Sequence, residues 1–157
     1  MQHQVTLSVE EPFAVDGAAL LRAARAVLDA EVTQPAEMSV VITDDETVRG
    51  LNQEFRGYDE PTDVLSFGLS ERMKPAADGD EFFPFPDLPD DLLHLGEVVV
   101  SYPTAERQAT EHGRVVIDEL RHLLIHGALH LLGHDHAEPK EEAVMRAREQ
   151  ELLSASR

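Results

Sequence analysis

The spacing of apolar residues along the chain predicts strands and helices that alternate. Residues 4–9 alternate polar and apolar side chains, as expected of an edge or half-buried strand. Asp16 can cap a helix that ends near Ala30 and has apolar residues at intervals of three and four. Further strands are expected at 38–43, 64–67 and 96–101, and further helices at 44–56, 102–112, 115–132 and 139–153. This order favours an α+β (mixed α/β) fold, in which a mixed sheet of roughly four strands is layered with helices.

The stretch 69–93 interrupts this pattern. It contains four prolines, many acidic residues and the cluster Phe82, Phe83 and Phe85. We expect an irregular acidic insertion, which either has a function or is a solvated loop without one. The chain of 157 residues is otherwise expected to form a single domain, 1–157.

The amino-acid composition limits which catalytic groups, metal ligands and partners can be expected. The chain has no cysteine, which excludes disulfide partners and thiolate catalysis and leaves histidines and carboxylates as candidate metal ligands. Its formal net charge of -18 opposes non-specific binding of nucleic acid. The net charge does not exclude a local basic cleft, and it does not count a bound metal cation. No apolar run reaches the roughly 18 residues of a membrane span, and the first residues show no secretory pattern. We therefore expect a cytoplasmic protein without a membrane partner.

The stretch from His126 to His136 has the spacing of a metal site. His126 and His130 lie four residues apart on a predicted helix, so both imidazoles project from one face. Gly133 can end that helix in a left-handed turn and let the chain return to deliver His136. Three protein ligands with one open position are typical of catalytic zinc. One zinc ion is expected, although imidazole also binds nickel and copper.

Gly127 distinguishes this stretch from the metzincin proteases. Those enzymes share the histidine spacing but carry a glutamate, their general base, directly after the first histidine. Without that base, peptide hydrolysis is disfavoured. A phosphodiester instead needs positive charge near its transition state, which a metal and an arginine can supply together. A glycine here is also expected to open space beside the metal for a bulky substrate.

Several neighbouring residues have more than one interpretation. His134 or Asp135 could supply a fourth ligand and make the zinc structural, or Asp135 could orient a ligand histidine. His122 lies one turn before His126 and could orient substrate or relay a proton, or it could be an ordinary surface histidine. Arg56, at the end of a predicted helix, could bind substrate or only interact with the helix dipole.

Two motifs together resemble the YbeY family of bacterial rRNA maturation factors, described as single-strand-specific metallo-endoribonucleases. Residues 126–136 match the family's His-Gly-x-Leu-His-Leu-x-Gly-Tyr-Asp-His block except at His134, where the family typically has tyrosine. Residues 56–67 match its Arg-x-x-Asp-x-Pro-Thr-Asp/Asn-Val-Leu-Ser-Phe block. Residues 95–101 and 119–122 resemble its Leu-Gly-Asp-Ile-x-Ile-Ser strand and the acidic lead into its metal helix.

The resemblance implies a zinc-dependent endoribonuclease. His126, His130 and His136 would bind the zinc, and Arg56 would be a catalytic residue that binds the scissile phosphate. His122 is a further catalytic candidate. So is His134, which titrates near neutral pH but could also compete as a ligand or be a tolerated surface change. The implied substrate is single-stranded RNA, in 3′-end maturation of 16S rRNA and ribosome quality control. The implied partners are the small ribosomal subunit and its assembly GTPase.

Two other functions stay open on the sequence. The ligand spacing also fits a zinc metalloprotease-like hydrolase, which chelator-sensitive peptide cleavage would favour. A non-catalytic ribosome-assembly factor with structural zinc would melt when the metal is removed, whereas its Arg56→Ala variant would still support ribosome assembly.

Overall fold

The computed structural model describes residues 3–68, 93–133 and 139–155. The elements follow in the order β1 (Gln4–Val9), α1 (Gly17–Glu31), β2 (Ala36–Thr43), α2 (Asp45–Arg56), β3 (Val64–Gly68), β4 (Leu93–Ser101), α4 (Tyr102–His112), α5 (Val116–Leu131) and α6 (Pro139–Ala155). The described residues thus contain five helices and a sheet of four strands, which confirms the expected α+β fold. None of the described helices has the length and apolar character needed to cross a membrane.

The four strands form one mixed sheet in the order β1-β2-β4-β3. β1 and β2 pair in parallel, as do β2 and β4, whereas β3 runs antiparallel to β4. Among the described residues, β1 and β3 are therefore the edge strands. The half-buried alternation of β1 follows from this position, as its sequence predicts.

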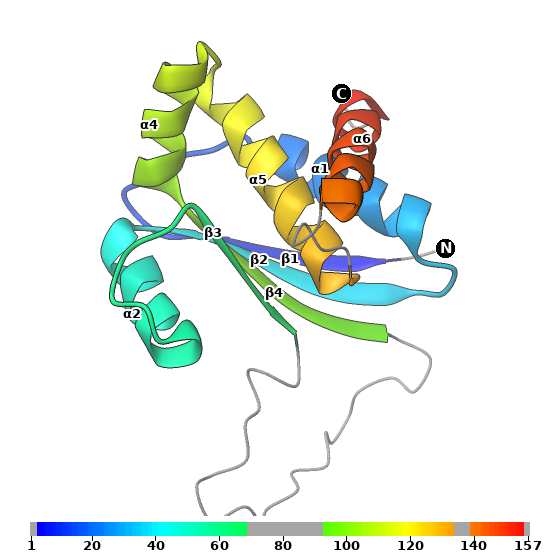
Figure 1. The fold of residues 1–157 in the computed structure, drawn as a ribbon, viewed down its shortest axis with the longest axis horizontal. Coiled ribbons are helices and arrows are strands. Elements are labelled where there is room, and N and C mark those ends of the chain that lie inside the picture. Colours follow the sequence, from blue (N-terminus) through cyan, green and yellow to red (C-terminus); the bar gives the residue numbers. More distant parts are fainter. Residues whose placement is uncertain (1–2, 69–92, 134–138, 156–157) are drawn as a thin grey trace, which may run out of the picture.

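Helices cover both faces of the sheet (Figure 1). α1, α5 and α6 pack on one face, around buried side chains of β2 and β4 such as Met38, Val40 and Val98. α2 packs on the opposite face, where Val48 and Phe67 are completely buried. α5 lies at the centre of the fold because it contacts α1, α4, α6 and both β3 and β4. The predicted metal helix is therefore held by the sheet and by three other helices.

Local hydrogen bonds and positive backbone angles set the ends of the helices that carry the predicted site. The Asp44 side chain accepts a hydrogen bond of 2.7 Å from the backbone N–H of Thr47 and so caps α2. The same backbone hydrogen bond lowers the pKa of Asp44. Gly57 ends α2 directly after Arg56 with φ 81°, a left-handed conformation that glycine adopts without steric cost. Gly133, with φ 96°, follows α5 as its sequence predicts.

Among the strand boundaries, the start of β4 differs most from the sequence prediction. β4 begins at Leu93 and not at Gly96, so the last residue of the predicted insertion belongs to the sheet. Leu93 pairs with Ala36, and the register then shifts between Glu37 and Met38. This irregularity breaks the simple alternation from which strands are predicted. The remainder of the insertion, 69–92, lies outside the described residues.

Candidate active site

His126 and His130 project from the same side of α5, as their spacing predicts. Their ring centroids are 4.8 Å apart, with the ring planes inclined by 69°. Two tetrahedral zinc ligands with Zn–N distances of about 2.0–2.1 Å have ring centroids about 5 Å apart, so this pair fits one ion. The predicted third ligand His136 and the catalytic candidate His134 lie outside the described residues. Within 3–68, 93–133 and 139–155, no three metal-binding side chains form a group.

The apolar pattern of α5 explains why the two histidines face outward. Leu120, Leu124 and Leu129 on its other sides are completely buried in the main core. The histidine side remains partly open, and 28% of the His126 side chain is exposed. Burial of one stripe therefore orients the helix and leaves the histidines at the protein surface.

Gly127 faces the sheet and not the candidate metal site. A Cβ atom at this position would lie 2.7 Å from Cγ1 of Val98, 3.0 Å from Oγ of Ser66 and 3.1 Å from Cγ2 of Val64. The expectation that this glycine opens space for a bulky substrate is therefore wrong. Its missing side chain instead lets α5 approach β3 and β4 closely, and a glutamate base here would collide with these side chains.

Arg56 and the two histidines line one cleft of about 530 Å³. Nη2 of Arg56 donates a hydrogen bond of 2.6 Å to the backbone carbonyl of Ser66. Its guanidinium carbon also lies 5.4 Å from the centroid of the Phe67 ring, in cation–π contact. These two contacts hold the Arg56 side chain against β3, so its interactions extend beyond the C-terminal end of α2.

The edge strand β3 brings α2 and α5 together from opposite faces of the sheet. Ser66 accepts the hydrogen bond of Arg56 through its carbonyl oxygen and donates one of 2.8 Å from Oγ to the carbonyl oxygen of Gly127. A single residue of β3 thus contacts both helices. This explains how an arginine and a histidine pair from separate motifs line the same cleft.

A second cleft, of about 510 Å³, lies between α4, α5 and α6. His126 and Asp63 line both clefts, whereas His122 lines only this second one. Asp63 accepts hydrogen bonds from the backbone N–H of Val64, at 2.8 Å, and from the side chain of Gln108, at 3.2 Å. The structure therefore brings Arg56, His126 and His130 together and places His122 on the far side of His126.

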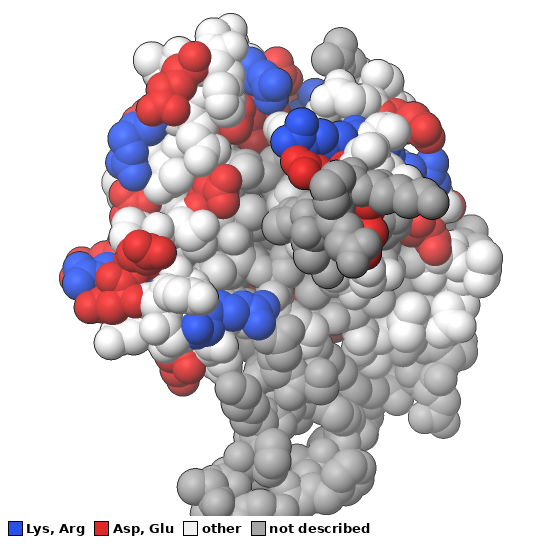
Figure 2. Space-filling model, viewed as in Figure 1, with Lys and Arg blue, Asp and Glu red and all other residues white. Residues whose placement is uncertain are grey.

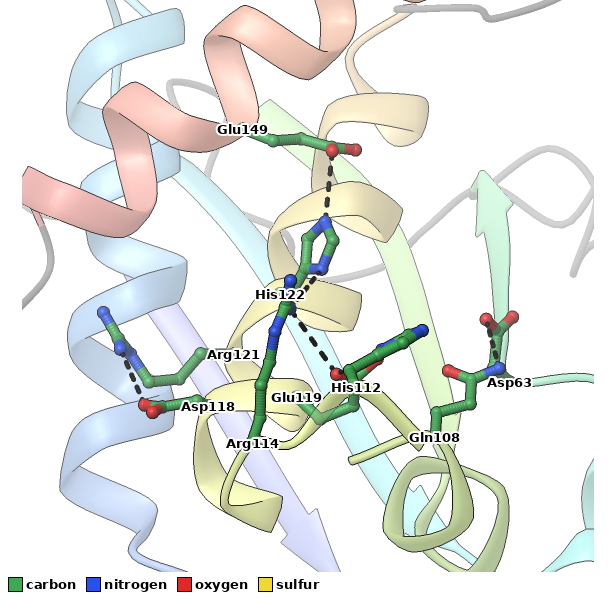
Figure 3. A network of polar contacts seen from close by, with 9 residues as sticks. All are labelled: Asp63, Gln108, His112, Arg114, Asp118, Glu119, Arg121, His122 and Glu149. Atoms are coloured by element: carbon green, nitrogen blue, oxygen red, sulfur yellow. Dashed lines mark hydrogen bonds and ion pairs between the residues drawn. The ribbon is translucent and has the colours of Figure 1, made fainter. Parts of the chain in front are cut away.

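Glu149 of α6 joins His122 to His126, which Figure 3 shows in part. One carboxylate oxygen lies 2.5 Å from Nδ1 of His126 and the other 3.2 Å from Nε2 of His122. Only 6% of the Glu149 side chain is exposed. Burial opposes its ionisation, but hydrogen bonds and charge interactions with the two histidines outweigh burial and lower the pKa of Glu149 to about 2.

The sequence prediction missed Glu149 because α6 contains many acidic residues, and an acid in such a helix suggests a solvated face. One signal was present. Glu149 lies four residues after Met145 and three before Leu152, and both of these are buried in the core. An acidic residue on the apolar face of a helix is buried with its neighbours and needs a hydrogen-bond or ion-pair partner there.

Charges of both signs are mixed over the face shown in Figure 2. Lysine and arginine side chains are separated by acidic and uncharged ones, and they form no continuous basic surface among the described residues of this face. This agrees with the formal net charge of -18. Any anionic ligand of this site must therefore be held by local contacts in the cleft.

Comparisons with known proteins agree with the two motifs. The profile of a family described as endoribonuclease YbeY matches residues 7–157. An endoribonuclease YbeY from Dehalococcoides mccartyi is 44% identical over 147 residues, covering 92% of this chain and 84% of the relative. One from Chloroflexus aggregans is 43% identical over 159 residues, covering 99% and 97%.

A solved structure shares the fold. The solution structure of TM1509 from Thermotoga maritima aligns with a TM-score of 0.59 at 24% identity, covering 99% of this chain and 89% of that chain. At this identity the likeness concerns the fold alone. The family match and the relatives over almost the whole length show that this chain belongs to the YbeY family.

Proposed function

We propose that this protein is a zinc-dependent endoribonuclease that cleaves single-stranded RNA. The observation that carries the proposal is the shared cleft of Arg56 with His126 and His130. The name endoribonuclease, which the family and its relatives bear, supports the same activity.

His126, His130 and His136 would hold the zinc. The described pair fits a single ion, and neutral imidazoles with an open position suit zinc. When bound, the ion supplies Lewis acidity at a phosphate oxygen and lowers the pKa of a water molecule toward neutrality.

Arg56 would bind and orient the scissile phosphate. A guanidinium carries five N–H donors in a planar fork that matches two phosphate oxygens. Its contacts with Ser66 and Phe67 limit the orientations of this fork before substrate arrives. Less conformational entropy is then lost when the phosphate binds, and the arginine is already placed to stabilise negative charge that develops there.

The cleft favours a short contact with the RNA backbone. Among its described lining residues, Arg56 is the only lysine or arginine, and the other polar groups besides the two histidines are Thr62, Asp63 and Ser66. A duplex-binding surface usually neutralises many phosphates at once. A cleft with one such cation is better suited to one or two nucleotides of a single strand.

We further propose that the cellular substrate is 16S rRNA near its 3′ end, processed in the cytoplasm in association with the small ribosomal subunit and its assembly GTPase. The resemblance of the motifs to the YbeY family supports this role.

The proposal is tested by RNA cleavage with matched variants. The unmodified protein should cut a single-stranded fragment of the 16S precursor and spare a duplex. A chelator should abolish cleavage, and added zinc should restore it. His126→Ala should lose activity, and Arg56→Gln should lose at least about 100-fold in kcat. Arg49→Gln removes the same charge from the same helix and should change kcat less than about twofold, because Arg49 pairs with exposed Asp59.

Three results would contradict the proposal. Equal cleavage by all variants would indicate a contaminating nuclease. Chelator-sensitive cleavage of casein without RNA cleavage would indicate a protease. If the protein unfolds without zinc, and cells with the Arg56→Gln variant still assemble the small ribosomal subunit normally, the protein is a non-catalytic assembly factor.

A further inference from the structure

We propose that Glu149 is the positioning residue of the metal site: it holds His126 in the one tautomer that can present Nε2 to zinc. This inference rests on the zinc site proposed above. Glu149 belongs to α6, outside both motifs that identify the family, and its two carboxylate oxygens contact His126 and His122 separately.

The contact with His126 fixes where that ring carries its proton. The two oxygens of Glu149 meet Nδ1 of His126 and Nε2 of His122, and a carboxylate only accepts hydrogen bonds. Nδ1 of His126, 2.5 Å away, must therefore be the donor. A neutral imidazole with its proton on Nδ1 has its lone pair on Nε2, the nitrogen that then binds a metal.

His122 orients the carboxylate from its other side (Figure 3). Nη1 of Arg114 lies 3.3 Å from Nδ1 of His122, and an arginine only donates, so Nδ1 accepts. The proton of His122 is then on Nε2, which donates to the second oxygen of Glu149 at 3.2 Å. His122 thus acts on the metal site through Glu149, which fits its position in the second cleft.

The packing of α6 places the carboxylate. Met145 and Leu152, on the same side of the helix, are 1% and 2% exposed. Nη2 of Arg121 on α5 donates a hydrogen bond of 2.9 Å to the carbonyl oxygen of Leu153 and joins the two helices. Only 6% of the Glu149 side chain is exposed, so the packing of α6 against α5 holds its carboxylate beside the two histidines.

Loss of such a carboxylate partner lowers metal affinity without removing a ligand. An outer carboxylate orients the imidazole and raises its basicity, and its mutation costs about 10–100-fold in affinity. Glu149→Gln keeps the size of the side chain but replaces one acceptor oxygen with an NH2 group and removes the charge. Glu149→Asp keeps the charge and should recover part of the loss.

The first test measures zinc affinity at a single neutral pH by competition with a chromophoric chelator. Glu149→Gln should bind zinc about 10–100-fold more weakly than the unmodified protein. The control Glu151→Gln removes an acid two residues away whose side chain is 64% exposed, and it should stay within about twofold. A folded Glu149→Gln protein with unchanged zinc affinity would overturn the positioning role, even if its melting temperature had fallen.

The second test needs no variant and no metal. Long-range ¹⁵N–¹H NMR of the unmodified protein should show His126 protonated on Nδ1 and His122 on Nε2. Protonation of His126 on Nε2 would overturn the inference whether or not Glu149→Gln folds. Unmodified protein that binds no zinc would instead refute the proposed function itself, and with it the metal role of Glu149.

Discussion

Gly127 shows how a missing side chain can determine the position of a helix. The atoms nearest to where its Cβ would lie belong to Val98, Ser66 and Val64, on the two strands beneath α5. Because no side chain separates the helix backbone from these strands, Ser66 can donate its hydroxyl to the Gly127 carbonyl. Gly127 stands where metzincin proteases carry their glutamate base, and it is therefore also the residue that lets α5 pack closely on the sheet.

Gly127→Ala should destabilise the protein by about 1–3 kcal/mol, because the added methyl group overpacks the contact of α5 with the side chains of Val98, Ser66 and Val64. Gly50→Ala is the matched control. A Cβ at Gly50 meets nothing within 4 Å, so the same substitution should stabilise α2 by about 0.5–1 kcal/mol. Urea unfolding of both variants measures the difference, and effects of the same sign would contradict this account of Gly127.

Single residues of the site differed in how far the sequence could predict them. His126 and His130 were predictable because helical spacing alone places them side by side. Glu149 was not, because its partner lies 23 residues away on another helix and only tertiary packing joins them. His122 had two interpretations from its spacing, and its partners Arg114 and Glu149 distinguish its environment from that of an ordinary surface histidine.

At the scale of elements, α2 is anchored at both of its ends. At its C-terminal end, Arg56 contacts the edge strand β3. At its N-terminal end, Asp45 accepts hydrogen bonds from Ser101, the N-cap of α4, at 2.5 Å, and from Thr104 and Arg107 in the first two turns of α4, at 2.6 Å and 3.0 Å. The helix that carries the proposed phosphate-binding arginine is therefore tied to the helix beside the second cleft.

Asp45→Asn should lower the free energy of unfolding by about 1 kcal/mol at pH 7, an amount that allows for the partial exposure of the carboxylate. Burial raises the pKa of Asp45, but hydrogen bonds from Ser101, Thr104 and Arg107 outweigh it, and the pKa lies below its ordinary value of 3.8. A lowered pKa stabilises the fold above that ordinary value and ceases to do so as pH falls through the folded-state value.

The stabilities of Asp45→Asn and the unmodified protein should therefore converge as the pH falls below about 4. Glu46→Gln removes an exposed acid from the same helical turn and should cost less than about 0.5 kcal/mol at either pH. Chemical denaturation at pH 7 and in acid measures both differences. A deficit of Asp45→Asn that persists undiminished in acid would show that the carboxylate charge is not what joins α2 to α4.

Most elements were predictable because each buries one face. The burial pattern of β1 and the cap of α1 by Asp16 follow directly from the order of side chains. α1 buries Leu20, Ala23, Ala24, Val27 and Leu28, at the intervals of three and four that its sequence predicts. The start of β4 was missed because strand pairing at Leu93 depends on β2 and not on the local sequence.

At the scale of the whole molecule, the acidic charge sets how RNA can be held. A protein with a formal net charge of -18 repels polyanions at long range, and salt weakens that repulsion. Attraction at the cleft depends on few cations, since Arg56 is the only lysine or arginine among its described lining residues. Binding should therefore change little with salt, in contrast to proteins with broad basic surfaces.

The slope of log K against log salt for a short single-stranded RNA should be shallower than about -2, because each phosphate contact contributes about -0.7. Arg56→Gln should make it shallower by about 0.7, and Arg49→Gln should leave it unchanged. Titrations with metal-free protein avoid cleavage during the measurement. A slope steeper than about -4 would mean that binding is spread over many cations outside this cleft.

The arrangement of the whole molecule was only partly predictable. Alternating strands and helices indicated a layered sheet, but the order β1-β2-β4-β3 and the antiparallel β3 depend on long-range pairing. Arg56 and the histidines line a common cleft beside β3, the last strand in this order.

The order of translation determines when the contact between α5 and α6 can form. Translation proceeds from the N-terminus, so α5 emerges with His126 and His130 before α6 emerges with Glu149. A nascent chain that ends before α6 has the paired histidines but not the carboxylate that selects the tautomer of His126. High-affinity zinc loading would therefore have to wait until α6 docks on α5.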